Sequence, residues 1–438
     1  MAARGRRSAT ALLALTAVAT GAGPAPAQPQ GRPDAVTGPS AQDRSGRAAT
    51  AWSEGWSVPV QRPSTGFHEN WAETGFDRQT VRQVVRVTDS GTAARIRLSN
   101  RYGDAPLKLA GATIARRGEG AAVRSGSLRH LAFGRGRSAV IPAGGELVSD
   151  AATLRVTALE SLTVTLYFAG PTGPATFHAQ GFATTYRAAR DHRAGEGSEA
   201  VGDETESWYY LSGVEVSGGT GRPGRPRRGA VVAFGDSITD GFGSSKDADK
   251  RYPDALADRL AARGAPRPVL NAGIGGNLML NDSRWFGEHA SARFQRDVLD
   301  RPGVGSVIVL AGLNDIGFSE VDLPAYQPNP QVSVAELIAG YRELIERAHA
   351  EGIKATGATL LPFKGSEYHT PRSEAKRTAL NEWIRTSGAY DSVVDFAQVL
   401  AAPSDADLLA PRYDSGDHKH PNDAGYRAMA EAVDLSSL

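Results

Sequence analysis

The 438-residue sequence contains no cysteine, which excludes cysteine nucleophiles and thiolate metal sites. It also contains no apolar run approaching the roughly 20 residues that a membrane-spanning helix needs. Neither sign of charge dominates, because the sequence contains 49 Lys and Arg and 48 Asp and Glu, which gives a formal net charge of +1. We therefore expect no membrane span, and the charge gives no reason to expect nucleic acid or an anionic membrane as a partner.

The first 27 residues have the three parts of a secretory signal peptide. Three arginines, at positions 4, 6 and 7, precede a run of small and apolar residues over 9–22, and Ala25, Pro26 and Ala27 form an A-x-A cleavage site. We expect residues 1–27 to be removed and the mature protein to be secreted and extracellular, with a formal charge of −2 once the three arginines are lost. Residues 28–49 lack apolar periodicity and are interpreted as a flexible tether.

Two regions with different patterns of apolar and polar residues follow the tether. In residues 50–216, apolar side chains such as Ile96 and Leu98 alternate with polar ones, as they do again over 162–168. This period of two predicts short antiparallel strands, and many such strands pack as a β-sandwich or jelly roll. The Gly, Pro and Arg-rich residues 217–229 are predicted to be an interdomain linker.

From residue 230 onward, short apolar strands alternate with helical stretches. Strands are expected over 230–234, around 269–270, and over 306–310, 355–361 and 392–395, with the clearest helix over 334–348 and a last one over 424–433. This alternation predicts an α/β domain over 230–438 with an open parallel sheet covered on both faces. Active groups collect at the carboxyl ends of such strands.

Four polar or Gly-rich segments lie directly after predicted strands. The first, residues 235–239, contains Ser237, which suits either a nucleophile or a helix N-cap. The second, residues 271–277, has closely spaced glycines that suit a phosphate cradle, an oxyanion site or a tight turn. In the third, residues 312–315, the amide of Asn314 suits an oxyanion donor or a turn.

The fourth segment, residues 417–422, places Asp417 three residues before His420. This spacing lets the carboxylate contact one ring nitrogen of the imidazole while the other ring nitrogen faces outward. Pro421 restricts the backbone of His420 to an extended conformation. The alternative is a metal site made of Asp417, His418 and His420, which lacks a fourth clustered ligand.

Together, the four segments resemble the four motif blocks of the GDSL, or SGNH, hydrolase family, in the family's order and near its spacing. The resemblance covers about residues 230–438 and implies a flavodoxin-like α/β/α fold. By position, Ser237 resembles the nucleophile, His420 the general base and Asp417 the residue that orients the base. The backbone N–H of Ser237, Gly276 and Asn314 resemble the three oxyanion donors.

This sequence differs from the family pattern in two places. The first block has Ile238 where the family has leucine, which is a mild apolar exchange. The second block has adjacent glycines, so Gly275 is an alternative donor to Gly276, which we favour from its offset from Asn271. The segment containing Arg293, Phe294 and Asp297 resembles a secreted arylesterase/acylhydrolase-like branch, which often carries an extra amino-terminal β domain.

The resemblance implies a serine esterase that needs no metal or organic cofactor. We expect a small-molecule or polysaccharide ester as the substrate, with short acyl groups such as acetyl. Two alternatives stay open: a lipase or arylesterase for longer acyl chains, and a carbohydrate-binding protein with an inactive hydrolase domain.

Three further features bear on the substrate. The Pro-rich residues 318–332 are expected to overhang the site. Leu278, Met279 and Leu280 are interpreted as helix core rather than an acyl pocket. Trp52, Trp56 and Trp71 are interpreted as aromatic core or interdomain packing rather than a sugar-stacking surface.

Overall fold

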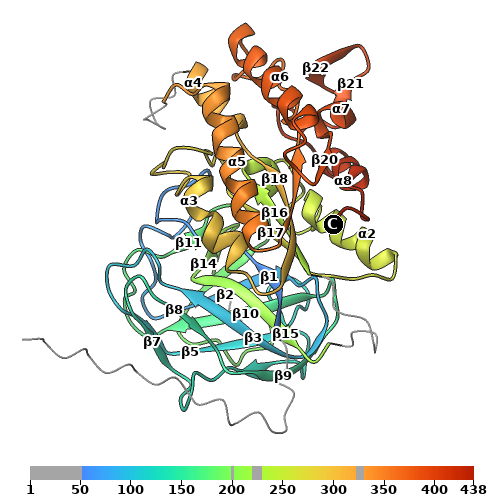
Figure 1. Cartoon of the computed structure of the whole chain (residues 1–438). Coiled ribbons are helices and arrows are strands. Elements are labelled where there is room, and N and C mark those ends of the chain that lie inside the picture. The colour runs from blue at the N-terminus through green and yellow to red at the C-terminus, as the bar shows by residue number, and fades with distance from the viewer. Residues whose placement is uncertain (1–51, 199–201, 220–228, 322–329) are drawn as a thin grey trace, which may run out of the picture. The chain divides into compact units, whose positions relative to one another are not determined.

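The computed structural model describes residues 52–198, 202–219, 229–321 and 330–438. The predicted signal peptide (1–27) and tether (28–49) lie outside these residues, as does most of the predicted linker (217–229). We call residues 52–217 the β domain and residues 229–438 the α/β domain (Figure 1).

The β domain contains two main antiparallel sheets and, among its described residues, no helix. The first sheet has the order β1 (Trp52–Ser57), β15 (Leu211–Ser217), β3 (Gly91–Ser99), β8 (Glu146–Val148), with β9 (Ala152–Val156) also on β3. The second has the order β13 (Asp203–Thr205), β12 (Thr185–Ala189), β2 (Gln79–Arg86), β10 (Ser161–Phe168), β5 (Gly111–Arg116), β6 (Arg129–His130). Two short pairs complete the domain: β11 (Phe177–His178) with β14 (Trp208–Tyr209), and β4 (Leu107–Leu109) with β7 (Ala139–Ile141).

The inward side chains of both sheets share one core. Ile96 and Val214 from the first sheet and Ile114 and Val164 from the second belong to the same buried cluster. This sharing makes the domain a sandwich, so the predicted all-β fold class is confirmed.

The predicted alternation of buried and more exposed side chains is present on β3 but not on β10. Thr163 and Thr165 point away from the sandwich core and are nevertheless buried. The side chain of Arg82 lies over this outer face, where Nε donates to Thr165 Oγ1 at 3.2 Å. Its other nitrogens donate to backbone oxygens, including those of His192 and Gly195, so a loop held by an arginine covers a face expected to be exposed.

Two of the three N-terminal tryptophans belong to the core of the β domain, as expected. Trp56 packs edge-on against Trp208, with 5.0 Å between ring centroids. Trp71 stacks on Tyr209 on one side, while the Arg187 guanidinium lies 4.3 Å from its ring centroid. Trp52 is only half-buried and lies against Arg95. Because Trp71 already has these two partners, it does not offer a free platform for a sugar ring.

The α/β domain is built on a five-stranded parallel sheet. Its order is β17 (Val269–Gly273), β16 (Ala230–Gly235), β18 (Val304–Leu310), β19 (Lys354–Ala358), β20 (Ser392–Val394). The strands therefore run 2-1-3-4-5 in chain order, which is the flavodoxin-like order predicted for this domain. A short antiparallel pair, β21 (Ala401–Ala402) with β22 (Asp405–Leu409), lies near the C-terminus of the chain.

Helices cover both faces of this sheet (Figure 1). One group comprises α3 (Ala290–Phe294), η1 (Gln295–Leu299), α4 (Leu313–Glu320), α5 (Val334–Ala350) and α6 (Pro371–Thr386). The other comprises α2 (Tyr252–Ala262), α7 (Phe396–Leu400) and α8 (Asp423–Ala432), and the single turn α1 (Ser237–Asp240) follows β16. The helix predicted over 334–348 is α5, which begins with a Ser333–Glu336 capping box and buries Leu337, Tyr341 and Leu344.

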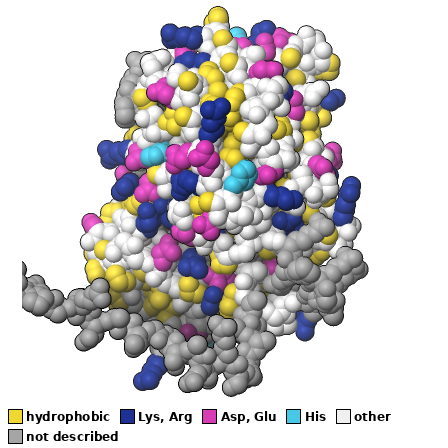
Figure 2. All heavy atoms as spheres, in the orientation of Figure 1, with side chains coloured by type: hydrophobic (Ala, Val, Ile, Leu, Met, Phe, Trp, Pro, Cys, Tyr) yellow, Lys and Arg dark blue, Asp and Glu magenta, His cyan; other side chains and the backbone are white. Residues whose placement is uncertain are grey.

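The described surface carries charges of both signs. On the face shown in Figure 2, Lys and Arg side chains are interspersed with Asp and Glu side chains rather than gathered by sign. Among the residues that the structure describes, no helix is long and apolar enough to cross a bilayer.

Candidate active site

Ser237 lies where β16 gives way to α1, at the carboxyl edge of the parallel sheet. The chain turns sharply here, and a Cβ on Gly235 would lie 2.1 Å from Leu310 O, so only glycine fits. Asp236 caps the new helix by accepting a hydrogen bond from Ile238 N–H at 3.1 Å. As the first residue of α1, Ser237 has no helical acceptor for its own N–H.

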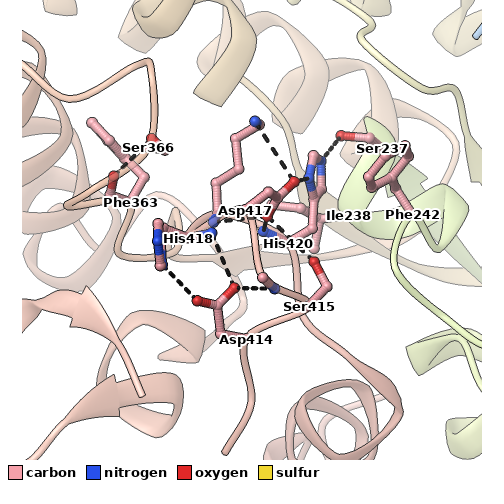
Figure 3. Close-up of polar contacts among 12 residues, drawn as sticks. Ser237, Ile238, Phe242, Phe363, Ser366, Asp414, Ser415, Asp417, His418 and His420 are labelled. Atoms are coloured by element: carbon pink, nitrogen blue, oxygen red, sulfur yellow. Dashed lines mark hydrogen bonds and ion pairs between the residues drawn. The ribbon is translucent and has the colours of Figure 1, made fainter. Parts of the chain in front are cut away.

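The structure brings Ser237 and His420 together although 183 residues separate them in the chain. Ser237 Oγ lies 2.8 Å from His420 Nε2, and His420 Nδ1 lies 2.5 Å from Asp417 Oδ2 (Figure 3). Ser237 and His420 are each 7% exposed, so their contact is largely shielded from water. An alcohol, an imidazole and a carboxylate in this order can activate the alcohol as a nucleophile.

The Asp417 carboxylate is held by its neighbours as well as by the imidazole. Its Oδ1 accepts hydrogen bonds from the backbone N–H of Lys419 at 3.1 Å and of His420 at 2.9 Å. Burial opposes ionisation of this carboxyl, but the hydrogen bonds and charge of His420 outweigh burial and hold the pKa of Asp417 below its usual range. Asp417 is therefore a fixed anion beside the ring.

The two histidines of this segment have separate partners. His418 Nδ1 contacts Asp414 Oδ2 at 2.7 Å, and its ring lies apart from that of His420 in Figure 3. Within the described residues, no cluster of three or more His, Cys, Asp or Glu side chains is arranged to hold a metal ion. The geometry thus gives no support to the metal-site alternative for Asp417, His418 and His420.

The glycine-rich second segment forms the loop after β17, and its two glycines differ in their hydrogen bonds. Gly275 N–H donates to Asp240 Oδ2 at 2.9 Å, so this donor already has an acceptor. Gly276 has a left-handed φ of 70°, and a Cβ there would lie 2.4 Å from the ring of Phe286. The occupied N–H of Gly275 leaves Gly276 as the better candidate for an oxyanion donor.

Asn314 lies in the first turn of α4, after β18, and is buried. Its Oδ1 accepts a hydrogen bond from the Tyr368 hydroxyl at 3.0 Å, which fixes the orientation of the amide. One Nδ2 hydrogen is donated to Asn277 O at 3.1 Å, and an amide nitrogen carries a second hydrogen for another acceptor. Tyr368 was not expected from the sequence.

Leu278, Met279 and Leu280 are not in a helix, contrary to expectation. The backbone N–H groups of Met279 and Leu280 donate to the Asp315 carboxylate at 2.7 and 3.2 Å instead of to helical carbonyls. Leu278 and Met279 are nevertheless buried, so the expectation that they are core residues is confirmed. Burial raises the pKa of Asp315 to about 6 despite these two hydrogen bonds.

Arg293 ties the first two segments together. Its fully buried guanidinium donates to Gly235 O at 2.7 Å, to Ala272 O at 2.8 Å and to Asn277 Oδ1 at 2.9 Å. Asp297 supplies the countercharge at 3.2 Å. Arg293, one of the three residues on which the resemblance to the arylesterase branch depends, thus holds the ends of β16 and β17 together, and Asp297, another of the three, balances its charge.

Aromatic rings surround the candidate site. Phe242 packs on His420 with 4.4 Å between ring centroids. Phe67 of the β domain stacks on Phe286, Phe286 stacks on Phe318, and Phe318 meets Tyr368 edge-on. This cluster could not be predicted from the sequence, because its members are scattered along the chain. Of the segment expected to overhang the site, 318–332, residues 322–329 lie outside the described part of the chain.

A family model matches the region that contains all four segments. Residues 233–428 match the model of the GDSL-like lipase/acylhydrolase family. The α/β domain belongs to this family. It is an SGNH-type ester hydrolase domain, as the sequence predicted, and the antiparallel β domain precedes it.

Solved structures similar to this GDSL-like domain come from several bacteria. They include a GDSL-like lipase from Bacteroides thetaiotaomicron (20% identity, 50% of this chain and 91% of that chain, TM-score 0.35). A lipase/acylhydrolase from Enterococcus faecalis has 19% identity over 46% of this chain and 92% of that chain (TM-score 0.36). An acetyl xylan esterase from Geobacillus stearothermophilus has 22% identity over 47% of this chain and 92% of that chain (TM-score 0.36). No curated protein matches the chain.

Proposed function

We propose that this protein is a secreted serine esterase that hydrolyses short-chain acyl esters, acetyl esters above all, with acetylated carbohydrate as the natural substrate class. Ser237 is the nucleophile, His420 the general base and Asp417 the residue that orients the base. The observation that carries this proposal is the 2.8 Å contact between Ser237 Oγ and His420 Nε2 beside a ring nitrogen that is held by Asp417.

The reaction begins with proton transfer from Ser237. His420 Nε2 accepts the hydroxyl proton while Oγ attacks the ester carbonyl, and the resulting imidazolium then protonates the leaving alcohol. Asp417 holds the tautomer in which Nδ1 carries the proton and stabilises the imidazolium. Water attacks the acyl-enzyme by the same proton route in reverse, so these steps require no metal or organic cofactor.

The tetrahedral intermediate carries negative charge on the former carbonyl oxygen. The N–H groups of Ser237 and Gly276 and the side-chain amide of Asn314 are the proposed donors to this oxygen. Each such donor is worth ~10²–10³ in rate in enzymes of this type. Asn314 is well suited because Tyr368 already fixes its amide, so no reorientation is needed during the reaction.

The preference for short acyl groups rests on the aromatic cluster. Phe286 lies against Gly276, and Phe318 and Tyr368 continue the cluster toward Asn314. These large rings fill space next to the proposed oxyanion donors, which favours a small acyl group there. Carbohydrate as the alcohol part rests on the expected export of the protein and on its accessory β domain.

An ester panel with a nucleophile variant tests the proposal. Ser237→Ala is expected to abolish turnover of 4-nitrophenyl acetate, while Ser125→Ala, a change at an exposed serine of the β domain, is expected to keep it. The wild type is expected to release acetate from acetylated xylan and to hydrolyse acetate esters faster than octanoate esters. Full turnover by Ser237→Ala would refute the assignment of the nucleophile.

The same panel separates the alternatives. A preference for octanoate or longer esters would identify a lipase or arylesterase instead. Absence of turnover together with failure of an organophosphonate to label Ser237 would identify an inactive hydrolase domain, and binding to insoluble glycans would then point to a carbohydrate-binding protein.

Secretion is proposed from the signal-peptide pattern of residues 1–27. Amino-terminal sequencing of protein recovered from the culture medium is expected to begin at Gln28. Retention of the intact amino terminus inside the cell would contradict this proposal.

A further inference from the structure

A buried histidine of the β domain reaches into the α/β domain close to the proposed oxyanion donors. His178 lies in β11 and is 1% exposed, and its Nε2 lies 3.0 Å from Oδ1 of Asp240, which is 2% exposed. Its other ring nitrogen, Nδ1, lies 2.9 Å from Pro59 O. The ring also stacks on Trp208, with 5.7 Å between centroids, so its position is fixed by contacts on three sides.

These contacts determine where the protons are. Pro59 O can only accept, so His178 Nδ1 carries a proton. A second proton must lie between Nε2 and Asp240 Oδ1, because two lone pairs facing each other at 3.0 Å would repel. Whichever atom holds this second proton, His178 and Asp240 together are electrically neutral, and the carboxyl group is held in one orientation.

The other oxygen of the Asp240 carboxyl group holds the loop after β17, which contains the proposed donor Gly276 and is called the oxyanion loop below. Asp240 Oδ2 accepts a hydrogen bond from Gly275 N–H at 2.9 Å, and Gly275 directly precedes Gly276. Asp240 itself is the last residue of α1, which begins with Ser237. One carboxyl group therefore connects the helix of the nucleophile to the peptide that leads into the proposed donor.

The β domain also packs directly on this loop. A Cβ on Gly275 would lie 1.9 Å from Gln180 Oε1 and 2.9 Å from the ring of Phe67, both of which belong to the β domain. At Gly273, the last residue of β17 before the loop, a Cβ would lie 2.2 Å from Asp240 N of α1. The loop is thus enclosed between α1 and the β domain, and its placement depends on both.

We infer that His178 is a positioning residue for the oxyanion hole: through Asp240 it fixes the Gly275 peptide and thereby aims Gly276 N–H at the reacting oxygen. The inference rests on the proposed function, because it needs Gly276 to be an oxyanion donor. It gives the β domain a part in catalysis, in addition to any binding of substrate.

The expected effect is a loss of rate rather than of affinity. Displacing a catalytic donor by about 1 Å costs on the order of 10²-fold, and removing one donor costs ~10²–10³-fold. Loss of the His178–Asp240 contact is therefore expected to lower kcat by ~10–100-fold. Because the hydrogen bond from Gly276 strengthens as the oxyanion forms, KM is expected to stay within about threefold.

Two substitutions of His178 separate its two contacts. In His178→Gln, the side-chain amide nitrogen can take the place of Nε2 and donate to Asp240. In His178→Asn, the shorter amide can take the place of Nδ1 and donate to Pro59 O, but it does not reach Asp240. We expect His178→Asn to have a kcat ~10–100-fold lower than that of the wild type and His178→Gln to keep most of the wild-type kcat. A merely structural role would affect both variants alike.

Thr88→Val is the matched control for the domain interface. Thr88 Oγ1 of the β domain accepts from Val269 N–H at 3.0 Å, at the start of β17, the opposite end of that strand from the oxyanion loop. This variant loses a buried hydrogen bond between the domains without touching the loop. It is expected to unfold at a lower temperature than the wild type and to keep its kcat.

Hydrolysis of 4-nitrophenyl acetate by the full chain, with kcat and KM determined separately, decides the outcome. Equal kcat values for wild type and His178→Asn, alongside an inactive Ser237→Ala, would overturn the role of His178 and leave the proposed function intact. A fully active Ser237→Ala would overturn the proposed function itself.

If the His178 variants do not fold, Asp240 provides the test. In Asp240→Asn the amide oxygen can still accept from Gly275 N–H and the amide nitrogen can donate to a neutral His178, so kcat is expected within about fivefold of wild type. Asp240→Leu has no acceptor and is expected to lose ~10–100-fold. Equal kcat in the two Asp240 variants would overturn the inference.

Discussion

At the scale of single residues, Asp417 governs which nitrogen of His420 carries a proton. Its Oδ1 is occupied by two backbone N–H groups, so Oδ2 is the atom that faces His420 Nδ1. In Asp417→Asn, the amide oxygen would keep the backbone contacts and the amide nitrogen would face Nδ1. The ring would then carry its proton on Nε2, where it cannot accept the proton of Ser237.

We therefore predict that Asp417→Asn lowers kcat/KM by ~10³–10⁴-fold and His420→Ala by ~10⁵–10⁶-fold. Initial rates with 4-nitrophenyl acetate measure both, and added imidazole is expected to restore part of the activity of His420→Ala only. His418→Asn is the matched control, since its ring contacts Asp414 and asparagine tolerates the left-handed φ of 65° at this position. Equal losses in the two triad variants would contradict the assigned roles.

Asp236 is a buried acid whose ionisation opposes folding at neutral pH. Burial raises the pKa of Asp236 to about 7 from the usual 3.8. Between these values the folded state holds a proton that the unfolded state has lost, so the free energy of unfolding falls as the pH rises from about 4 to 7. The contribution is fully present below pH 4 and is lost as the pH passes 7.

Asp236→Asn is predicted to remove this part of the pH dependence. The asparagine oxygen can still accept from Ile238 N–H, and the side chain does not ionise. Between pH 5 and pH 8, the wild type is expected to lose on the order of 2–4 kcal/mol of stability through this group, and the variant is expected to lose less. Urea unfolding at both pH values measures the difference, and identical pH slopes would contradict the prediction.

At the scale of elements, the loop after β17 requires glycine at position 276 for two reasons. The backbone there is left-handed, and a Cβ would collide with the ring of Phe286. Gly276→Ala is therefore predicted to displace the loop and to lower kcat by ~10²-fold, as measured with 4-nitrophenyl acetate. The unfavourable φ alone is not expected to lower kcat by this much.

Gly264→Ala isolates the backbone contribution. Its φ of 67° is nearly the same, but no atom lies within 4 Å of a Cβ at that position. It is expected to cost ~1–2 kcal/mol of stability and no activity. Equal kcat values in the Gly276→Ala and Gly264→Ala variants would show that the contact with Phe286 is unimportant.

Patterns within one element were sufficient to predict most of the elements. The helix expected over 334–348 is α5, because capping at Ser333 and the apolar spacing act locally. The helix expected for Leu278, Met279 and Leu280 is absent, because the Asp315 carboxylate, which lies far along the chain, takes their N–H groups. Local pattern fails where a distant side chain satisfies the backbone.

At the scale of the whole molecule, the order of the four motif segments was sufficient to predict that they form one site. The contacts between the β domain and the α/β domain could not be predicted from the sequence. Nothing near His178 in the sequence marks it as a partner of Asp240, because the pairing exists only once the β domain has folded against the α/β domain. The same holds for Arg301 of the α/β domain, whose Nη1 lies 3.0 Å from the buried Glu54 Oε1 of β1. Such pairs arise from tertiary packing and carry no local signal.

These buried contacts predict that the two domains unfold together. Removing the β domain would leave Asp240 without His178 and Val269 without Thr88, and would expose apolar surface around both. A chain of residues 229–438 is therefore expected to unfold at a lower temperature than the full chain and to have at least the ~10–100-fold lower kcat expected of His178→Asn. Calorimetry of the full chain is expected to show one transition, since breaking the interface uncovers buried ionic and hydrogen-bonding groups in both domains at once. Two separate transitions, with full activity in the shorter chain, would mean that the β domain is an independent module.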